Sequence, residues 1–290
     1  MKFGNFSTAL ILFALFNLGQ ARALPIHQSI NAIQARDFFE PAQNYNFLGT
    51  VKLNDCSGSL IRFENSKDSD QALVLTNGHC VDTDQGDMMG ANVFISHRKE
   101  ARNFRFLAAD GSLKPGSESS SELLFATITW NDIALYQLTA TYAEIKNKFA
   151  VDALVLDSQH PRAGIAIDVL SGYWQRGYSC KIDTFVFELH EEPFISKDSM
   201  RYSADGCHTI HGTSGSPVIA HDTGKVVGIN STGNDNGEKC TMDNPCEVSA
   251  NGDIFYQKGL SYADETYVIY SCLNAANQFE LSTPGCKVFH

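Results

Sequence analysis

Residues 211–220 read HGTSGSPVIA, a turn rich in glycine and serine that runs directly into a short apolar segment. Glycines on both sides of Ser214 permit the tight backbone that exposes a serine hydroxyl. A plain glycine-serine turn between two strands explains the same letters. This stretch therefore predicts a turn followed by a β-strand, and leaves open whether Ser214 has a chemical role.

Short apolar segments of the same kind recur from Phe47 onward. They are rich in Val, Ile, Leu, Phe, Tyr and Thr, and many alternate apolar with polar residues, as strands do. Turn residues separate them, which favours an all-β fold of barrels or sandwiches over β-α-β units. The predicted strands lie in residues 47–53, 57–63, 72–77, 91–97, 122–130, 132–138, 164–173, 181–189, 216–220, 225–231 and 266–272.

The first 23 residues have the pattern of a signal peptide. A basic start at Lys2 is followed by an apolar run, and Ala21 and Ala23 have the small-residue spacing that signal peptidase requires. The apolar run is shorter than the roughly 20 residues of a membrane-spanning helix. We expect cleavage after Ala23 and an exported protein without membrane insertion, either extracellular or periplasmic. Residues 24–45 are then an N-terminal arm or a short prosegment.

The composition restricts the partners. The chain has 22 basic and 33 acidic residues, so loss of Lys2 and Arg22 with the signal peptide moves the formal net charge from −11 to −13. Such an acidic surface disfavours nucleic acid and anionic lipid as partners. All eight cysteines lie in the exported part, where an oxidising compartment lets them pair.

Three short strings carry residues of catalytic type: LTNGHC at 75–80, NDIAL at 131–135 and HGTSGSPV at 211–218. Amide hydrolysis by a serine needs an activated hydroxyl, a base of near-neutral pKa and a carboxylate that orients the base. Ser214, His79 and Asp132 supply one part each. Taken alone, a histidine is more often structural and an aspartate before a strand is often a turn residue.

The order His, Asp, Ser and the residues around each of them resemble the chymotrypsin-like (trypsin-fold) serine peptidases, and within these the bacterial branch that includes the glutamyl endopeptidases. CSGSLI at 56–61, LTNGHCVD at 75–82 and MRYSADGCHTIHGTSGSPV at 200–218 carry the resemblance, which covers roughly 47–272. It implies two antiparallel six-stranded β-barrels, at 46–159 and 160–290, with the active site in the cleft between them. The second barrel would end in a disulfide-closed C-terminal tail.

The same resemblance implies the roles of the site residues. His79 is the base, Asp132 orients it, Ser214 is the nucleophile, and the backbone N–H groups of Gly212 and Ser214 form the oxyanion hole. No cofactor is required. The expected function is that of a secreted, monomeric serine endopeptidase that acts on proteins or peptides through an acyl-enzyme.

Three departures from the family pattern matter. Animal members carry an aspartate at the position of Thr213, which pairs with a freed N-terminus, so that activation switch is expected to be absent. Trypsin-like members carry an aspartate at the position of His208, so the usual counter-ion for Arg or Lys is missing. Glutamyl endopeptidases share Thr209 but carry a histidine at the position of Asn230.

We therefore predict a substrate pocket without assigning the substrate side chain that it prefers. The pocket residues are His208, Thr209, Ser231, Thr232 and Gly233. Asp264 or Glu265 could also approach this pocket.

Family pattern and proximity predict the disulfides Cys56–Cys80, Cys180–Cys207, Cys240–Cys246 and Cys272–Cys286. No metal site is expected. HTIH at 208–211 and HEEP at 190–193 lack the HExxH pattern of zinc peptidases. DTDQGD at 82–87 lacks the glycine position and closing glutamate of an EF-hand calcium loop and fits a solvated turn.

Two other functions remain possible on the sequence. One is a secreted, non-catalytic module that binds partners through a peptidase fold, because a fold does not establish activity. The other is an esterase or another acyl transferase, although GTSGSP lacks the GxSxG motif of α/β-hydrolases.

Overall fold

The structure is a computed structural model, which describes residues 44–82 and 90–288. The predicted signal peptide 1–23 and nearly all of segment 24–45 lie outside the described residues, as does the acidic stretch 82–87 apart from Asp82. Within the described part, no helix has the length and apolar character needed to cross a membrane.

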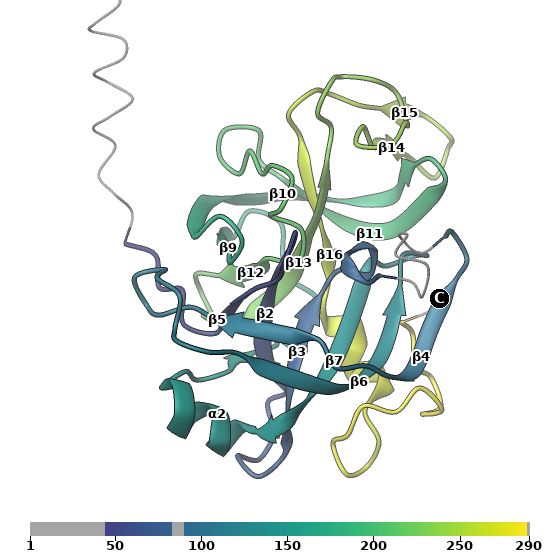
Figure 1. Cartoon of the computed structure of the whole chain (residues 1–290). Coiled ribbons are helices and arrows are strands. Elements are labelled where there is room, and N and C mark those ends of the chain that lie inside the picture. Colours follow the sequence, from purple (N-terminus) through teal and green to yellow (C-terminus); the bar gives the residue numbers. More distant parts are fainter. Residues whose placement is uncertain (1–43, 83–89, 289–290) are drawn as a thin grey trace, which may run out of the picture. The chain divides into compact units, whose positions relative to one another are not determined.

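The first sheet contains a closed six-stranded antiparallel barrel (Figure 1). Its strands pair in the order β1, β5, β6, β7, β3, β2, and β2 pairs with β1 to close the circuit. Outside the circuit, β4 pairs with β6 and β8 pairs with β2 in parallel. The bounds are β1 Thr50–Lys52, β2 Ser57–Arg62, β3 Gln71–Thr76, β4 Phe94–Lys99, β5 Asn103–Phe106, β6 Glu118–Thr127, β7 Ile133–Thr141 and β8 Leu154–Val155.

The second sheet follows a similar circuit of pairings. Its strands are ordered β11, β16, β13, β12, β9, β10, and β10 also pairs with β11; β14 and β15 extend it beyond β10. All pairs of this sheet are antiparallel. The bounds are β9 Ala166–Ser171, β10 Arg176–Glu191, β11 Phe194–Tyr202, β12 Pro217–Ala220, β13 Val226–Gly233, β14 Cys246–Val248, β15 Ile254–Phe255 and β16 Ser261–Glu265. The predicted all-β fold class is confirmed, and one of the two predicted barrels, in the first sheet, is closed.

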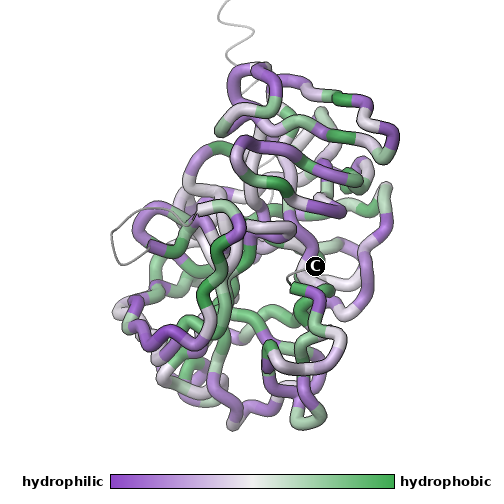
Figure 2. Tube along the Cα trace, turned by 90° about the vertical axis from the view of Figure 1, so that its right-hand side faces the viewer, coloured by the Kyte–Doolittle hydropathy of each residue, from purple (hydrophilic) through white to green (hydrophobic). Residues whose placement is uncertain are grey.

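Strand β3 and the first half of β7 are nearly continuous buried runs, at 72–76 and 133–136, because both of their faces are covered. In β7, Ala134 and Tyr136 belong to the barrel interior, whereas the alternating Ile133 and Leu135 belong to a second core. That second core also contains Ile229 of β13, so it joins the two sheets. Figure 2 shows hydrophobic segments in the interior of the trace and hydrophilic segments at many of its outer turns.

Helices are few. The α-helix α2, Tyr142–Phe149, begins at a capping box in which the Thr141 hydroxyl accepts from the Glu144 N–H and the Glu144 carboxylate accepts from the Thr141 N–H. The single-turn 3₁₀ helix η1, Gly78–Cys80, directly follows β3. A second 3₁₀ helix, η2, occupies Tyr267–Cys272.

The prediction of a strand at 266–272 is wrong. Ile269 and Cys272 are the buried residues of η2, and a spacing of three places them on one face of a 3₁₀ helix. Both contribute to the core that joins the sheets. The Tyr270 hydroxyl donates to Leu156 O at 2.9 Å and accepts from the Glu64 N–H at 3.0 Å. Tertiary packing therefore overrides the β propensity of this segment.

Candidate active site

Two paired strands of the first barrel bring His79 and Asp132 together. His79 lies in η1, just after β3, and Asp132 directly precedes β7; Thr76 of β3 is opposite Ala134 of β7. The Asp132 carboxylate accepts the His79 backbone N–H at 2.9 Å and lies 2.5 Å from its ring Nδ1. Nδ1 therefore carries a hydrogen, and Nε2 is the ring nitrogen left for proton transfer.

The surroundings of His79 make its ring more basic. Burial of the ring lowers its pKa, but the charge of Asp132 and the hydrogen bond to it outweigh burial, with smaller contributions from Glu191 and Asp264. The net effect raises the pKa of His79 above 6.5. The pKa of Asp132 is lowered: burial opposes its charge, but the attraction and hydrogen bonds of His79 prevail.

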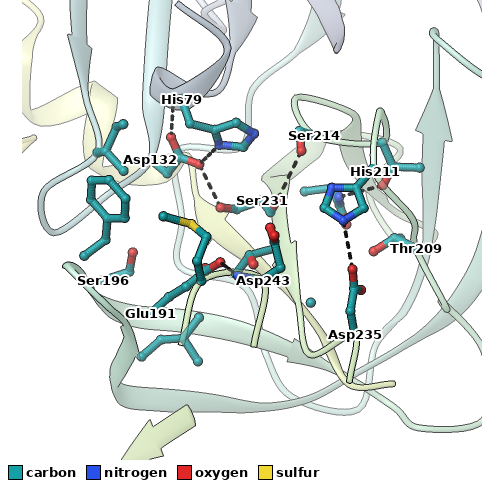
Figure 3. A pocket seen from close by; sticks show the side chains of 18 of the residues that line it. His79, Asp132, Glu191, Ser196, Thr209, His211, Ser214, Ser231, Asp235 and Asp243 are labelled. Atoms are coloured by element: carbon teal, nitrogen blue, oxygen red, sulfur yellow. Dashed lines mark hydrogen bonds and ion pairs between the residues drawn. The ribbon is translucent and has the colours of Figure 1, made fainter. Parts of the chain in front are cut away.

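Two residues of the second sheet, Ser231 and Asp264, interact with Asp132. The Ser231 hydroxyl, on β13, donates to Asp132 Oδ2 at 2.8 Å (Figure 3). Asp264 of β16 is 2 % exposed, and burial together with the charge of Asp132 raises the pKa of its carboxyl to about 8. Ser231, which was predicted for the substrate pocket, lines the cavity described below, and its hydroxyl also orients the carboxylate.

Ser214 sits in a turn that main-chain hydrogen bonds hold against both sheets. The Ser57 N–H of the first barrel donates to Ser214 O at 2.7 Å, and the Gly215 N–H donates to Asn230 O at 2.9 Å. The Ser214 hydroxyl donates to Ser231 O at 3.3 Å, and Figure 3 shows it across the cavity from the His79 ring.

The backbone just before Ser214 is shaped for a glycine. Gly212 has φ +86°, and a Cβ at this position would lie 2.7 Å from Cδ1 of Tyr173. The Trp174 indole N–H donates to His211 O at 2.6 Å. The C=O of His211 and the N–H of Gly212 point in opposite directions because they belong to one peptide group. The indole therefore helps to fix the direction of the Gly212 N–H.

His79, Asp132 and Ser214 line a cavity of about 160 Å³. Of the predicted pocket residues, Thr209, Ser231, Thr232 and Gly233 line it. His208 does not; its side chain is exposed, with Nδ1 3.4 Å from Gly259 O. The remaining lining residues are His79, Ile128, Asp132, Leu189, Glu191, Phe194, Ser196, Ile210, His211, Thr213, Ser214, Asn230, Asp235, Met242 and Asp243.

Several lining residues were missed from the sequence. Glu191 and Phe194 come from the β10–β11 hairpin, and Met242 and Asp243 come from the loop that Cys240 and Cys246 close. The Asp243 N–H donates to Glu191 Oε1 at 2.7 Å, which joins the two segments. Two cysteines six residues apart were the signal that could have marked this loop as ordered.

The four predicted disulfides are all present: Cys56–Cys80, Cys180–Cys207, Cys240–Cys246 and Cys272–Cys286. Cys56 and Cys80 lie beside His79 in an arrangement that resembles a metal site. Their sulfurs are bonded to each other, so they offer no thiolate ligand. His190 faces Glu188 at 2.9 Å and His211 faces Asp235 at 2.8 Å, so each pairs with a single carboxylate.

Solved structures of serine proteases match the structure of this chain at low sequence identity. The MamO protease domain from Magnetospirillum magneticum is 14 % identical with a TM-score of 0.47, and the match covers 79 % of this chain and 97 % of that one. A Nocardiopsis protease is 15 % identical with a TM-score of 0.41, covering 77 % and 92 %. No curated protein shows significant similarity to the chain.

The sequence model of the trypsin-like peptidase domain matches residues 56–229. The match begins at the cysteine bonded beside His79, includes Asp132 and Ser214, and spans more than half of the chain. The chain therefore belongs to the family of proteins with a trypsin-like peptidase domain.

Proposed function

We propose that this protein is a secreted serine endopeptidase that cleaves peptide bonds through an acyl-enzyme on Ser214. The observation that carries the proposal is the assembly of His79, Asp132 and Ser231 in the wall of the cavity that also contains Ser214. Four disulfides suit an oxidising compartment, in agreement with the predicted signal peptide.

The reaction follows from these positions. The Ser214 oxygen attacks the carbonyl carbon of the scissile bond while Nε2 of His79 takes the hydroxyl proton. Asp132 stabilises the resulting imidazolium and holds the ring. The imidazolium then gives its proton to the leaving amine as the C–N bond breaks and the acyl-enzyme forms. A water molecule repeats the sequence, with His79 as base and Ser214 as leaving group.

The developing oxyanion is stabilised by the backbone N–H groups of Gly212 and Ser214. Removing one donor of this kind typically reduces kcat by about 10²- to 10³-fold. The Trp174–His211 hydrogen bond and the left-handed backbone of Gly212 prepare one of the two donors before substrate arrives. Preorganised donors stabilise charge without the cost of reorientation during the reaction.

The active-site turn is held without a charged N-terminus. Thr213 is buried, and its hydroxyl donates to Ile210 O and accepts from Asn230 Nδ2. These bonds occupy the position where animal members use an ion pair with a freed N-terminus. We infer that activity does not depend on such an activation step.

The charges of the cavity favour cationic substrates over acidic ones. Glu191, Asp235 and Asp243 line it, whereas none of the described lining residues is Lys or Arg. Its two imidazoles, on His79 and His211, already face carboxylates. The side-chain amide of Asn230 is engaged with the hydroxyls of Tyr202 and Thr213.

A substrate carboxylate would therefore find no free cationic partner among the described lining residues. We therefore expect peptides with Lys or Arg near the scissile bond to be cleaved faster than peptides with Glu or Asp there. The resemblance to glutamyl endopeptidases then concerns the sequence motifs and does not include a preference for acidic substrates.

The test combines a fluorophosphonate probe with a peptide library. We expect one covalent adduct, mapped to Ser214, and cleavage products with basic residues near the cut. Ser214→Ala should lose both, while Ser196→Ala, a serine in the same cavity, should keep both. A folded parent protein that neither reacts nor cleaves would contradict the proposal and favour the binding module. Turnover of esters without peptides would favour the esterase.

A further inference from the structure

Three titratable side chains from distant parts of the chain meet away from the catalytic residues. His160 lies between β8 and β9, Asp198 lies on β11, and Glu265 is the last residue of β16. The imidazole Nε2 is 3.0 Å from Glu265 Oε1 and 3.3 Å from Asp198 Oδ2. One ligand atom from each of the three lies within 4.8 Å of the others.

Glu265 is the unusual member of this cluster. Its side chain is 3 % exposed, and neither carboxylate oxygen has a hydrogen-bond partner. Burial of a polar group without hydrogen bonds is unfavourable, and burial of an unpaired charge much more so. The 3.0 Å approach of His160 lacks the alignment of a hydrogen bond. The Glu265 carboxyl thus has His160 and Asp198 as neighbours, and neither of its oxygens receives an aligned hydrogen bond.

The ring nitrogen of His160 that lies near the two carboxyl groups, Nε2, is the one that can bind a metal ion. Its Nδ1 lies 2.6 Å from Pro161 O, and because a carbonyl oxygen only accepts, Nδ1 carries a hydrogen. In the neutral ring, Nε2 then directs a lone pair towards Asp198 and Glu265. The rings of Phe185 and Tyr267 lie beside the imidazole, with centroids 4.4 and 5.2 Å away, and limit its rotation.

This is the common arrangement of a metal-binding histidine, whose second ring nitrogen donates to a backbone carbonyl or carboxylate. Ligand atoms about 2.0–2.1 Å from a tetrahedral zinc ion are about 3.3 Å apart. Two of the three separations, 3.0 and 3.3 Å, are close to that value, and the third is within 4.8 Å. Calcium prefers six to eight oxygen ligands and does not suit a site with an imidazole and two carboxylates.

We propose that His160 Nε2 and the carboxylates of Asp198 and Glu265 form a zinc site, with a fourth position open to water. The side chains of His160 and Asp198 are 39 % and 50 % exposed, so an ion can reach the site from solvent. A divalent cation would balance the two carboxylates and satisfy the buried oxygens of Glu265.

The bound ion would have a structural role. It would tie the connection between β8 and β9 to two strands of the second sheet, and so add stability without entering the reaction. The neighbouring residue, Asp264, interacts with Asp132. Adjacent residues of a strand point to opposite faces, so Glu265 points away from Asp132.

The experiment measures zinc binding and thermal unfolding on the full secreted protein, carrying Ser214→Ala to prevent self-digestion. We expect one zinc ion per chain, a higher Tm with zinc, and no similar effect of calcium. His160→Gln and Asp198→Asn should each weaken zinc binding at least tenfold. Glu265→Gln, which keeps the shape but removes the charge, should do the same.

The matched control is His221→Gln. His221 Nε2 lies 2.9 Å from Asp168 Oδ1, and its side chain is 47 % exposed, but it faces one carboxylate and not two. This variant should bind zinc like the parent. Absence of zinc binding by the parent, or unchanged affinity in His160→Gln and Asp198→Asn, would overturn the proposal and leave the cluster as a contact among the three side chains. If His160→Gln fails to fold, the half-exposed Asp198→Asn decides by itself.

Discussion

The indole N–H of Trp174 donates to the carbonyl oxygen of His211 at 2.6 Å, and thereby connects the β9–β10 hairpin to the turn that precedes Ser214. The peptide group that accepts this bond also contains the N–H of Gly212. A side chain that touches neither the nucleophile nor the base thus helps to direct an oxyanion donor.

Trp174→Phe should lower kcat roughly 10-fold, because the aromatic ring remains while the donor is lost and the peptide group can rotate. KM should change little, since the oxyanion forms only in the transition state. Steady-state kinetics on a peptide substrate check this. Tyr173→Phe, at the adjacent position, is the control and should retain kcat. An unchanged kcat in Trp174→Phe would show that the turn keeps its conformation unaided.

Gly212→Ala should reduce kcat by about 10²- to 10³-fold, because a Cβ 2.7 Å from Tyr173 at φ +86° forces the peptide group out of position. Gly224→Ala is a matched control. Gly224 also has positive φ, +67°, but a Cβ there meets no atom within 4 Å. It should lose about 1 kcal/mol of stability and keep its kcat. Equal kcat losses in both variants would point to general backbone strain.

The pH dependence of kcat/KM should have an acidic limb with an apparent pKa above 6.5. His79 acts as a base only when neutral, and Asp132 outweighs the effect of burial and raises the pKa of the ring. Activity should therefore fall as pH drops through that raised value. Asp132→Asn should move the limb to lower pH and reduce kcat about 10⁴-fold. A limb in the parent at or below 6.5 would mean that Asp132 does not set the basicity of His79.

Ser231→Ala should reduce kcat by roughly 10- to 100-fold. The hydroxyl donates to Asp132 Oδ2 at 2.8 Å, and a hydrogen bond to a charged group contributes about 1.5–3 kcal/mol. Ser231→Thr keeps a hydroxyl and should recover part of the loss. The measurement is kcat together with the unfolding free energy, which separates a positioning role from a folding defect. Wild-type kcat in the alanine variant would assign the hydroxyl no role in orienting Asp132.

Much of the fold was accessible from the sequence because its signals are local. Turn residues around strands such as β3 and β7 identified the elements, and the glycines near Ser214 identified a turn that only glycine fits. Segment 266–272 shows the limit of such signals. Its β-forming residues became η2 because Ile269 and Cys272 could be buried in the core between the sheets.

The sequence by itself determined the all-β class and predicted the three residues of a serine peptidase site, since each rests on short patterns or their order along the chain. The cysteine pairing was predicted from the family resemblance. Only the tertiary structure decided which other residues reach the site. Strand register and loop closure bring Ser231, Glu191 and Asp243 to the cavity of His79 and Asp132. His160 meets Glu265 across 105 positions of sequence. Such contacts depend on how the sheets pack, and no local pattern records that packing.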